Sequence, residues 1–167
     1  NNAEANAYSL GLSFSGNTAN KLTTGSNIHV GTDYDYYKIS LPAGYNYTIT
    51  ARVHDQYSST NGSYTGDVLW AYNTGSGWSD TYDDVMGSDI TVVNGGTVTF
   101  YVAPYFSGQT GTYLFDLKVN RVASANSIVV ASPVSGDKWT KGTMRSIIWS
   151  DNISENVIIE LYRGTSL

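Results

Sequence analysis

The sequence predicts an all-β protein, namely an antiparallel, jelly-roll-like β-sandwich followed by part of a second sandwich. Short segments in which apolar and polar residues alternate recur along its 167 residues, and turn-forming residues separate them. Only 14% of the residues are charged, whereas glycine and tyrosine are abundant. The hydrophobic fraction of 41% suffices for a sandwich core. Together these features favour many short strands joined by polar turns.

The first segments lead to a central pair of strands. Residues 8–14 are apolar and are expected at a sheet edge, whereas the Gly-, Asn- and Thr-rich residues 15–27 are expected to form a connection. In residues 36–41 the odd-numbered side chains are aromatic or aliphatic, which predicts one core face. A Pro-Ala-Gly turn at 42–44 then leads into residues 45–53, whose odd positions are again apolar. We expect these two strands to pair as a hairpin.

The remaining strands of the first module follow a polar loop at residues 55–66. Residues 67–73 predict a strand, and the acidic residues 78–87 predict another loop. Asn94, Gly95 and Gly96 separate two apolar segments and predict a tight hairpin. The last strand, residues 112–122, places four alternating side chains on the core: Tyr113, Phe115, Leu117 and Val119.

The residue pattern of the sequence changes after residue 122. We expect a first domain at residues 1–122, a small polar linker at 123–126 and a partial second domain at 127–167. The second part reads as three strands, at residues 127–133, 147–150 and 157–162.

Four motifs resemble the bacterial pre-peptidase C-terminal domain, a β-sandwich appended to secreted hydrolases. Residues 33–44 follow the pattern Asp-x-Asp-Tyr-Tyr-x-Ile-x-Leu-Pro-Ala-Gly. Residues 4–7, Glu-Ala-Asn-Ala, stand where that family carries Glu-Pro-Asn-Asn, so Ala5 and Ala7 depart from it. Residues 67–73 and 111–115 stand for its later strands. The resemblance covers residues 4–122 and implies a non-catalytic accessory domain.

Residues 127–167 resemble the opening half of the immunoglobulin-like domain typified by yeast cell-wall β-glucan assembly proteins. The order of Ser-Pro, Gly-x-x-Trp, Ile-x-Trp-Ser and Ile-x-Leu-Tyr carries this resemblance. Three strands bury little apolar surface, and two of them are rich in isoleucine and valine. We therefore expect the chain to self-associate through residues 127–167.

Charge and composition exclude several classes of function. Residues 1–126 hold five basic and ten acidic side chains, which accounts for the net charge of −5. A surface of this sign repels phosphate backbones, so we expect no nucleic-acid partner. No apolar run is long enough to span a bilayer. The chain has no cysteine and opens without a leader, and we expect a secreted, extracellular part of a longer protein.

Two aspartates at the start of the central strand suggest a hard-cation site. Asp33 and Asp35 can direct their carboxylates at one point, and calcium prefers six to eight oxygen ligands. The resemblance implies calcium ligands at Glu4, Asn6, Asp33 and Asp35, although Ala7 removes one oxygen donor. The alternative is that Asp33 and Asp35 only shape a turn through hydrogen bonds to the backbone.

Four Trp and 14 Tyr exceed what one small core needs, so some rings should face solvent. The family pattern places Leu69 and Ala71 inside, which would expose Trp70 and Tyr72 beside Trp78 and Tyr82. Flat rings match the C–H faces of sugars, and these four residues are the predicted polysaccharide site. The alternative is that Trp70 and Tyr72 fill the core.

We expect no enzyme activity. Neither His29 nor His54 belongs to a nucleophile or metal motif, and adjacent Asp83 and Asp84 seldom converge on one bond. The sequence therefore predicts an accessory module that holds a linked catalytic domain on polysaccharide, with calcium stabilising the fold. The alternative is a structural, processing or protein-substrate-binding domain of a secreted peptidase.

Overall fold

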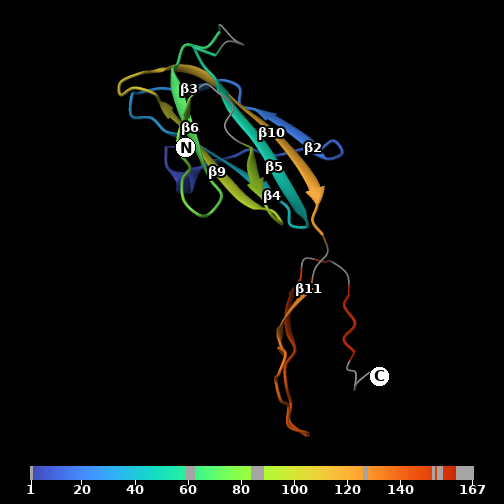
Figure 1. Cartoon of the computed structure of the whole chain (residues 1–167). Helices are drawn as coiled ribbons and strands as arrows, with labels where there is room; N and C mark the ends of the chain where they lie inside the picture. Colours follow the sequence, from blue (N-terminus) through green and yellow to red (C-terminus); the bar gives the residue numbers. More distant parts are fainter. Residues whose placement is uncertain are drawn as a thin grey trace. The chain divides into compact units, whose positions relative to one another are not determined.

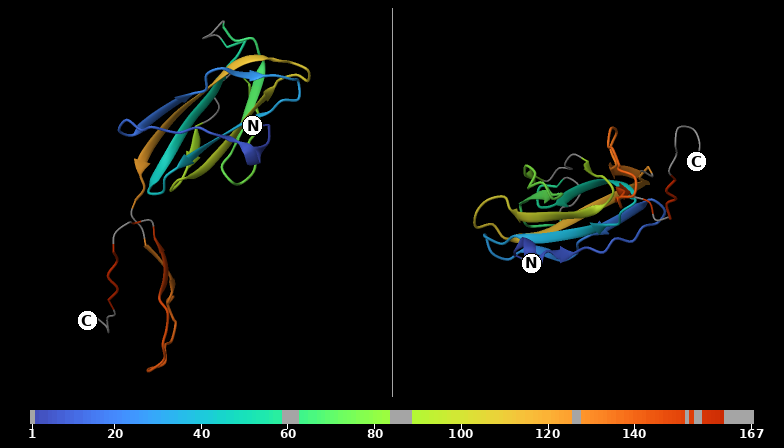
Figure 2. Two further views of the ribbon diagram at one scale, coloured as in Figure 1. Left: turned by 180° about the vertical axis from the view of Figure 1, so that it is seen from behind. Right: turned by 90° about the horizontal axis from the view of Figure 1, so that it is seen from below.

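The computed structural model describes residues 2–58, 63–83, 89–125, 128–151, 153 and 156–160. The chain divides into two compact units, Asn1–Ser124 and Ala125–Leu167. The first unit consists of two β-sheets, as Figures 1 and 2 show. Among its described residues, the one helical segment is the short 3₁₀ turn η1 (Glu4–Asn6). The predicted all-β sandwich is confirmed.

The first sheet has the strand order β1-β4-β9-β6-β7. Its strands pair antiparallel, except that β1 runs parallel to β4. The bounds of its five strands are β1 (Tyr8–Ser9), β4 (Asp35–Leu41), β6 (Val68–Asn73), β7 (Tyr82–Asp83) and β9 (Gly96–Pro104).

The second sheet is built around the long strand β10, which pairs with β2 and β3 on one side and with β5 on the other, and β8 follows β5. Its strands are β2 (Thr18–Leu22), β3 (Ser26–Ile28), β5 (Tyr45–His54), β8 (Ile90–Val92) and β10 (Gly111–Ala123). Two of these, β2 and β3, lie in the segment for which the sequence predicted a connection. Both find their partner on β10, far along the chain.

Both predicted hairpins are wrong, because each turn crosses from one sheet to the other. The turn at 42–44 joins β4 of the first sheet to β5 of the second, and the turn at 93–95 joins β8 of the second sheet to β9 of the first. The two crossings lie against each other: Gly44 N donates to Asn94 Oδ1 at 2.8 Å. A Cβ on Gly95, whose φ is +78°, would lie 2.5 Å from the Pro42 carbonyl oxygen, so only glycine fits there.

The core lies between the sheets and follows the alternation that the sequence predicts. The odd-numbered residues 37–41 of β4 and 47–53 of β5 are buried. On β10 all four predicted core residues have at most 1% of their surface exposed. Burying each such side chain contributes about 1.5–3 kcal/mol, and rings of Trp70, Phe100 and Phe115 fill the centre.

The second unit contains a two-stranded antiparallel sheet of β11 (Ile128–Ser132) and β12 (Ile148–Asp151) in its described part. Its apolar side chains are largely exposed, including Ile128, Val129, Val130 and Ile148. Residues 156–160 carry no strand, and Leu161 and Tyr162 of the expected third strand lie outside the described residues. The immunoglobulin-like resemblance stays a prediction.

Candidate functional site

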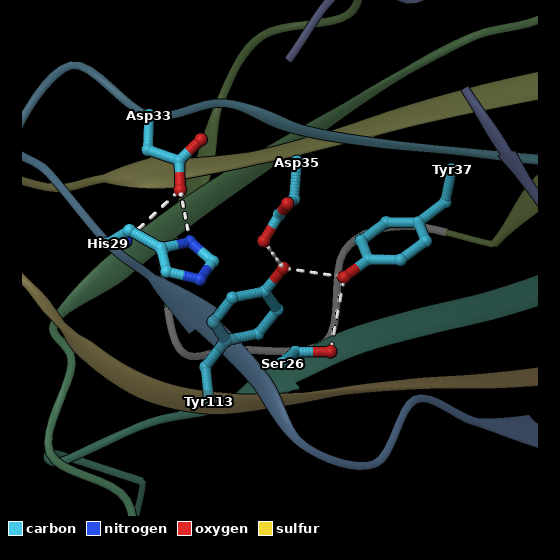
Figure 3. A network of polar contacts seen from close by, with 6 residues as sticks. All are labelled: Ser26, His29, Asp33, Asp35, Tyr37 and Tyr113. Carbon is cyan, nitrogen blue, oxygen red and sulfur yellow. Dashed lines mark hydrogen bonds and ion pairs between the residues drawn. The ribbon is translucent and has the colours of Figure 1, made fainter. Parts of the chain in front are cut away.

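The loop before β4 buries the first predicted calcium ligand. Asp33 is 2% exposed, and its Oδ2 accepts hydrogen bonds from His29 N and His29 Nδ1, both at 3.1 Å (Figure 3). The other oxygen, Asp33 Oδ1, is buried and has no hydrogen-bond partner. A buried carboxylate oxygen without a donor loses its water without compensation, so Asp33 retains the capacity to bind one more positive group.

Asp35 is buried beside it and ends a chain of hydroxyl groups. Tyr113 donates to Asp35 Oδ2 at 2.6 Å, the Tyr113 and Tyr37 hydroxyls lie 2.7 Å apart, and Tyr37 is 3.1 Å from Ser26 Oγ (Figure 3). Burial raises the pKa of the Asp35 carboxyl, the hydrogen bond from Tyr113 opposes this, and the nearby charge of Asp33 raises it further. The two carboxylates therefore interact electrostatically.

The remaining two predicted ligands lie on η1, which contacts β4, and both Glu4 and Asn6 are exposed. Burial and the neighbouring Tyr34 raise the pKa of the Tyr36 phenol, and the charge of Glu4 adds a smaller increase, so Glu4 lies near the start of β4. Glu4, Asp33 and Asp35 do not form a group whose ligand atoms all lie within 4.8 Å. The sequence thus identified two neighbouring buried carboxylates, Asp33 and Asp35, and the segment η1 that contacts β4. In this structure Glu4 does not lie close enough to them to share one ion.

The described residues contain one acidic cluster that the sequence did not suggest, formed by Asp55, Asp67 and Asp83, whose carboxylate oxygens lie within 4.8 Å of one another. Asp55 serves the backbone: its Oδ1 accepts from the amides of Tyr57 and Ser58, and its Oδ2 accepts from Val68 N. Its burial is explained by these bonds, which tie the loop after β5 to the start of β6. Asp84 lies outside the described residues.

The predicted exposure of Trp70 is wrong. Its side chain is 0% exposed and stacks on Tyr82 at 4.7 Å, and both Tyr72 and Tyr82 are half-buried beside it. The physical reason is the register of β6, in which Trp70 pairs with the buried Val102 of β9 and so points inward. Trp70 has no surface to offer a ligand, and Tyr72 and Tyr82 pack on the core as its partners.

Trp78 is the predicted aromatic residue that does face solvent, with 37% of its surface exposed. It belongs to a different group of rings on the outer face of the first sheet. We call this group, formed by Tyr34, Tyr36, Trp78 and Tyr101, the aromatic platform. Tyr36 of β4 lies opposite Tyr101 of β9, Trp78 contacts both rings at 6.0 and 4.9 Å, and Tyr34 contacts both at 6.3 and 5.6 Å.

Strand register explains why these rings gather. Tyr101 pairs with Tyr36 on one side and with Ala71 of β6 on the other, so the three side chains share one row of the outer face. Ala71 is fully buried although it points outward, and its small side chain leaves room for the rings above it. Alternation in the sequence already placed Tyr36 on this outer face, whereas Tyr101 is brought to it only by the β4–β9 pairing.

Few other described groups suggest chemistry. Arg52 Nε donates to His54 Nε2 at 3.0 Å, and the same imidazole nitrogen lies 3.4 Å from Asp116. This cluster joins β5 to β10 on the outer face of the second sheet. In the part of the chain that the structure describes, no helix is long and apolar enough to cross a membrane.

No family model matches the sequence, and no curated protein matches it either. Among solved structures it is similar to a mutant of PliG-Ec, a periplasmic inhibitor of g-type lysozyme from Escherichia coli, with 12% identity, 70% of this chain and 97% of that chain covered, and a TM-score of 0.40. PliG from Salmonella Typhimurium matches at 14% identity, 70% and 99% coverage and a TM-score of 0.39. The pre-peptidase C-terminal domain of a Bacillus anthracis collagenase matches at 16% identity, 72% and 100% coverage and a TM-score of 0.38.

Proposed function

We propose that the first unit is a non-catalytic accessory module of a secreted, multi-modular hydrolase and that it binds polysaccharide on the aromatic platform. The observation that carries this proposal is the contact of four aromatic rings on one solvent-facing side of the first sheet. Pyranose rings present flat C–H faces, which aromatic rings bind by dispersion and weak electrostatic attraction.

Polar groups adjoin the rings and support the same ligand class. The next row of the outer face consists of Lys38, Thr99 and Asn73, which are paired across β4, β9 and β6. Phenols are protonated at neutral pH, so the Tyr36 and Tyr101 hydroxyls can donate and accept hydrogen bonds, and burial raises the pKa of both still further above 10. Apolar faces with hydroxyl edges are what a sugar requires.

We also propose that calcium stabilises this module through Asp33 and Asp35, and that Glu4 and Asn6 of η1 move toward these carboxylates when the ion binds and complete its shell. The unpartnered Asp33 Oδ1 and the adjacent Asp35 fit the oxygen preference of calcium. The ion would neutralise two buried carboxylates, and the polysaccharide platform would gain stability from it without contacting it.

Affinity electrophoresis on gels that contain individual soluble polysaccharides tests the binding proposal. Replacing Trp78 by Ala should weaken retention roughly five- to thirtyfold, as expected for about 1–2 kcal/mol of lost contact. Phe106→Ala is the matched control, because Phe106 is 60% exposed on the loop after β9 and contacts Tyr105 rather than the platform. Equal losses in both variants, or retention on gelatin with none on any polysaccharide, would contradict the proposal and favour a protein-binding role.

A further inference from the structure

We infer that the aromatic platform takes a single, neutral glycan chain whose successive sugars are rotated relative to one another, and not the flat face of a crystalline polysaccharide. This inference rests on the proposed function and specifies its ligand. It is carried by the orientation of the four rings, which differs from that of a planar strip.

The rings lie in more than one plane. Tyr34 and Tyr36 are nearly parallel, with 22° between their planes. The Tyr101 ring is tilted by 58° from Tyr36 and by 59° from Tyr34. The Trp78 ring is tilted by 64° from Tyr36 and by 59° from Tyr101. A flat ligand surface that lies parallel to the Tyr34 and Tyr36 rings is therefore steeply inclined to the Tyr101 and Trp78 rings, and it contacts these by their edges.

A crystalline polysaccharide surface presents its sugar faces in one plane. A binding strip for such a surface needs coplanar rings, because a tilt near 60° replaces the face contact by an edge contact with less buried area. A single chain in solution can rotate about its glycosidic bonds and bring each sugar onto a differently oriented ring. The tilts therefore favour the single chain.

The spacing of the rings limits the number of sugars that the platform can hold. The Tyr36 and Tyr101 centroids are 6.1 Å apart, Tyr34 lies 6.3 and 5.6 Å from them, and Trp78 lies 6.0 and 4.9 Å from them. The four rings therefore form a compact group and not a row, with room for about two sugars of one chain. Affinity should accordingly rise with oligosaccharide length up to about two sugars and change little beyond that.

The platform is held in place before a ligand arrives. Trp78 follows a turn in which Asn73 Oδ1 accepts hydrogen bonds from the amides of Gly75 and Gly77, at 2.7 and 3.2 Å. The next residue, Ser79, exchanges two bonds with Tyr72 of β6: its amide donates to the Tyr72 carbonyl at 2.8 Å, and its Oγ accepts from Tyr72 N at 3.1 Å. These bonds fix the backbone that carries Trp78, and the contacts of its ring with Tyr36 and Tyr101 hold the ring at its tilt.

The charge of the module selects among single chains. Ten acidic and five basic side chains in residues 1–126 repel a polyanion such as a polyuronate or a sulfated glycan. Neutral chains of the β-1,3 or mixed-linkage glucan type combine uncharged sugars with rotation between successive rings, and they are the class that we expect to bind.

The test uses the full chain and measures three ligand sets. Isothermal titration with laminarin and mixed-linkage glucan should give saturable binding, and titration with their oligosaccharides should show affinity rising up to about two sugars and then levelling. Depletion on microcrystalline cellulose or crystalline chitin should be absent. Trp78→Ala and Tyr34→Ala should each reduce affinity for the soluble chains roughly five- to thirtyfold. Phe106→Ala should leave it unchanged, and far-UV circular dichroism checks that each variant is folded.

The outcomes separate the inference from the function on which it rests. Depletion on a crystalline surface at least as strong as binding to soluble chains would overturn the inference and leave polysaccharide binding standing. Preference for an acidic glycan would overturn the assignment of a neutral ligand. Binding to no polysaccharide of either kind would overturn the proposed function itself, and the inference with it.

Discussion

Two tryptophans of the first unit should respond oppositely to truncation, which tests whether the aromatic residues are correctly divided between core and surface. Trp70 is fully buried and packs on Tyr82 and Phe115. Replacing such a side chain by Ala costs about 3–5 kcal/mol, from lost burial and from the cavity that remains. Trp78 is partly exposed, and its replacement should cost about 1 kcal/mol.

These free energies correspond to distinct melting temperatures. For a domain of this size 1 kcal/mol shifts the midpoint by about 3–5 °C, so Trp70→Ala should lower it by roughly 9–25 °C and Trp78→Ala by about 5 °C or less. Thermal unfolding followed by far-UV circular dichroism measures both. The assignment of Trp70 to the core would be refuted if Trp70→Ala melted within a few degrees of the parent protein, or if Trp78→Ala lowered the melting temperature more than Trp70→Ala does.

Trp70→Phe refines the same test. The Trp70 Nε1 group is buried and has no hydrogen-bond partner, which costs about 1–3 kcal/mol relative to a solvated donor. Phenylalanine keeps much of the ring and removes this donor. Its cost should therefore be less than half that of Trp70→Ala, measured by the same melts.

Three further predictions concern the cation site and the second unit. Calcium at a hundredfold excess over its dissociation constant should raise the free energy of unfolding by about 2.7 kcal/mol and the melting temperature by about 10 °C in scanning calorimetry. Asp35→Ala should remove most of this shift. A melting temperature that neither calcium nor chelator changes would contradict the site. Without calcium, burial raises the pKa of Asp35 in the native state above its ordinary 3.8, so the native state holds this proton more tightly than the unfolded state does. The free energy of unfolding should therefore fall as pH rises from the unfolded-state pKa to the native-state pKa. Asp35→Asn should abolish that fall in urea titrations at several pH values. The exposed apolar side chains of β11 should cause the chain to self-associate through residues 127–167, so Val130→Asp should shift sedimentation toward the monomer, and a parent chain that is monomeric at every concentration would exclude this.

Local alternation was a reliable guide to the core of the first unit. The buried faces of β4, β5 and β10 follow directly from apolar residues at every second position, because successive side chains of a strand point to opposite sides. The same rule placed Tyr36 outward. It was insufficient for β6, where Val68, Trp70 and Ala71 are all buried, so that alternation does not tell which side of the strand faces the core.

Contacts between distant segments account for the rest. The family pattern predicts the wrong side for Trp70, because the side it faces depends on the pairing of β6 with β9. The platform required knowing that Tyr101 lies opposite Tyr36, and the polar segments that form β2 and β3 become strands only because β10 offers them partners. The carboxylates at Asp33 and Asp35 were identified from their spacing, whereas the hydrogen bond from Tyr113 depends on the approach of β10.

The crossing turns also determine how this unit must fold. Since the turns at 42–44 and 93–95 join different sheets, the strands on either side of them gain nothing from pairing with each other. The long ladders instead join β4 to β9 and β5 to β10, so a large loop must close before either ladder forms. Such nonlocal pairing makes folding slow, on the scale of milliseconds to seconds, and leaves unpaired strand edges exposed in the meantime. Isolated peptides that span either turn should accordingly remain unstructured.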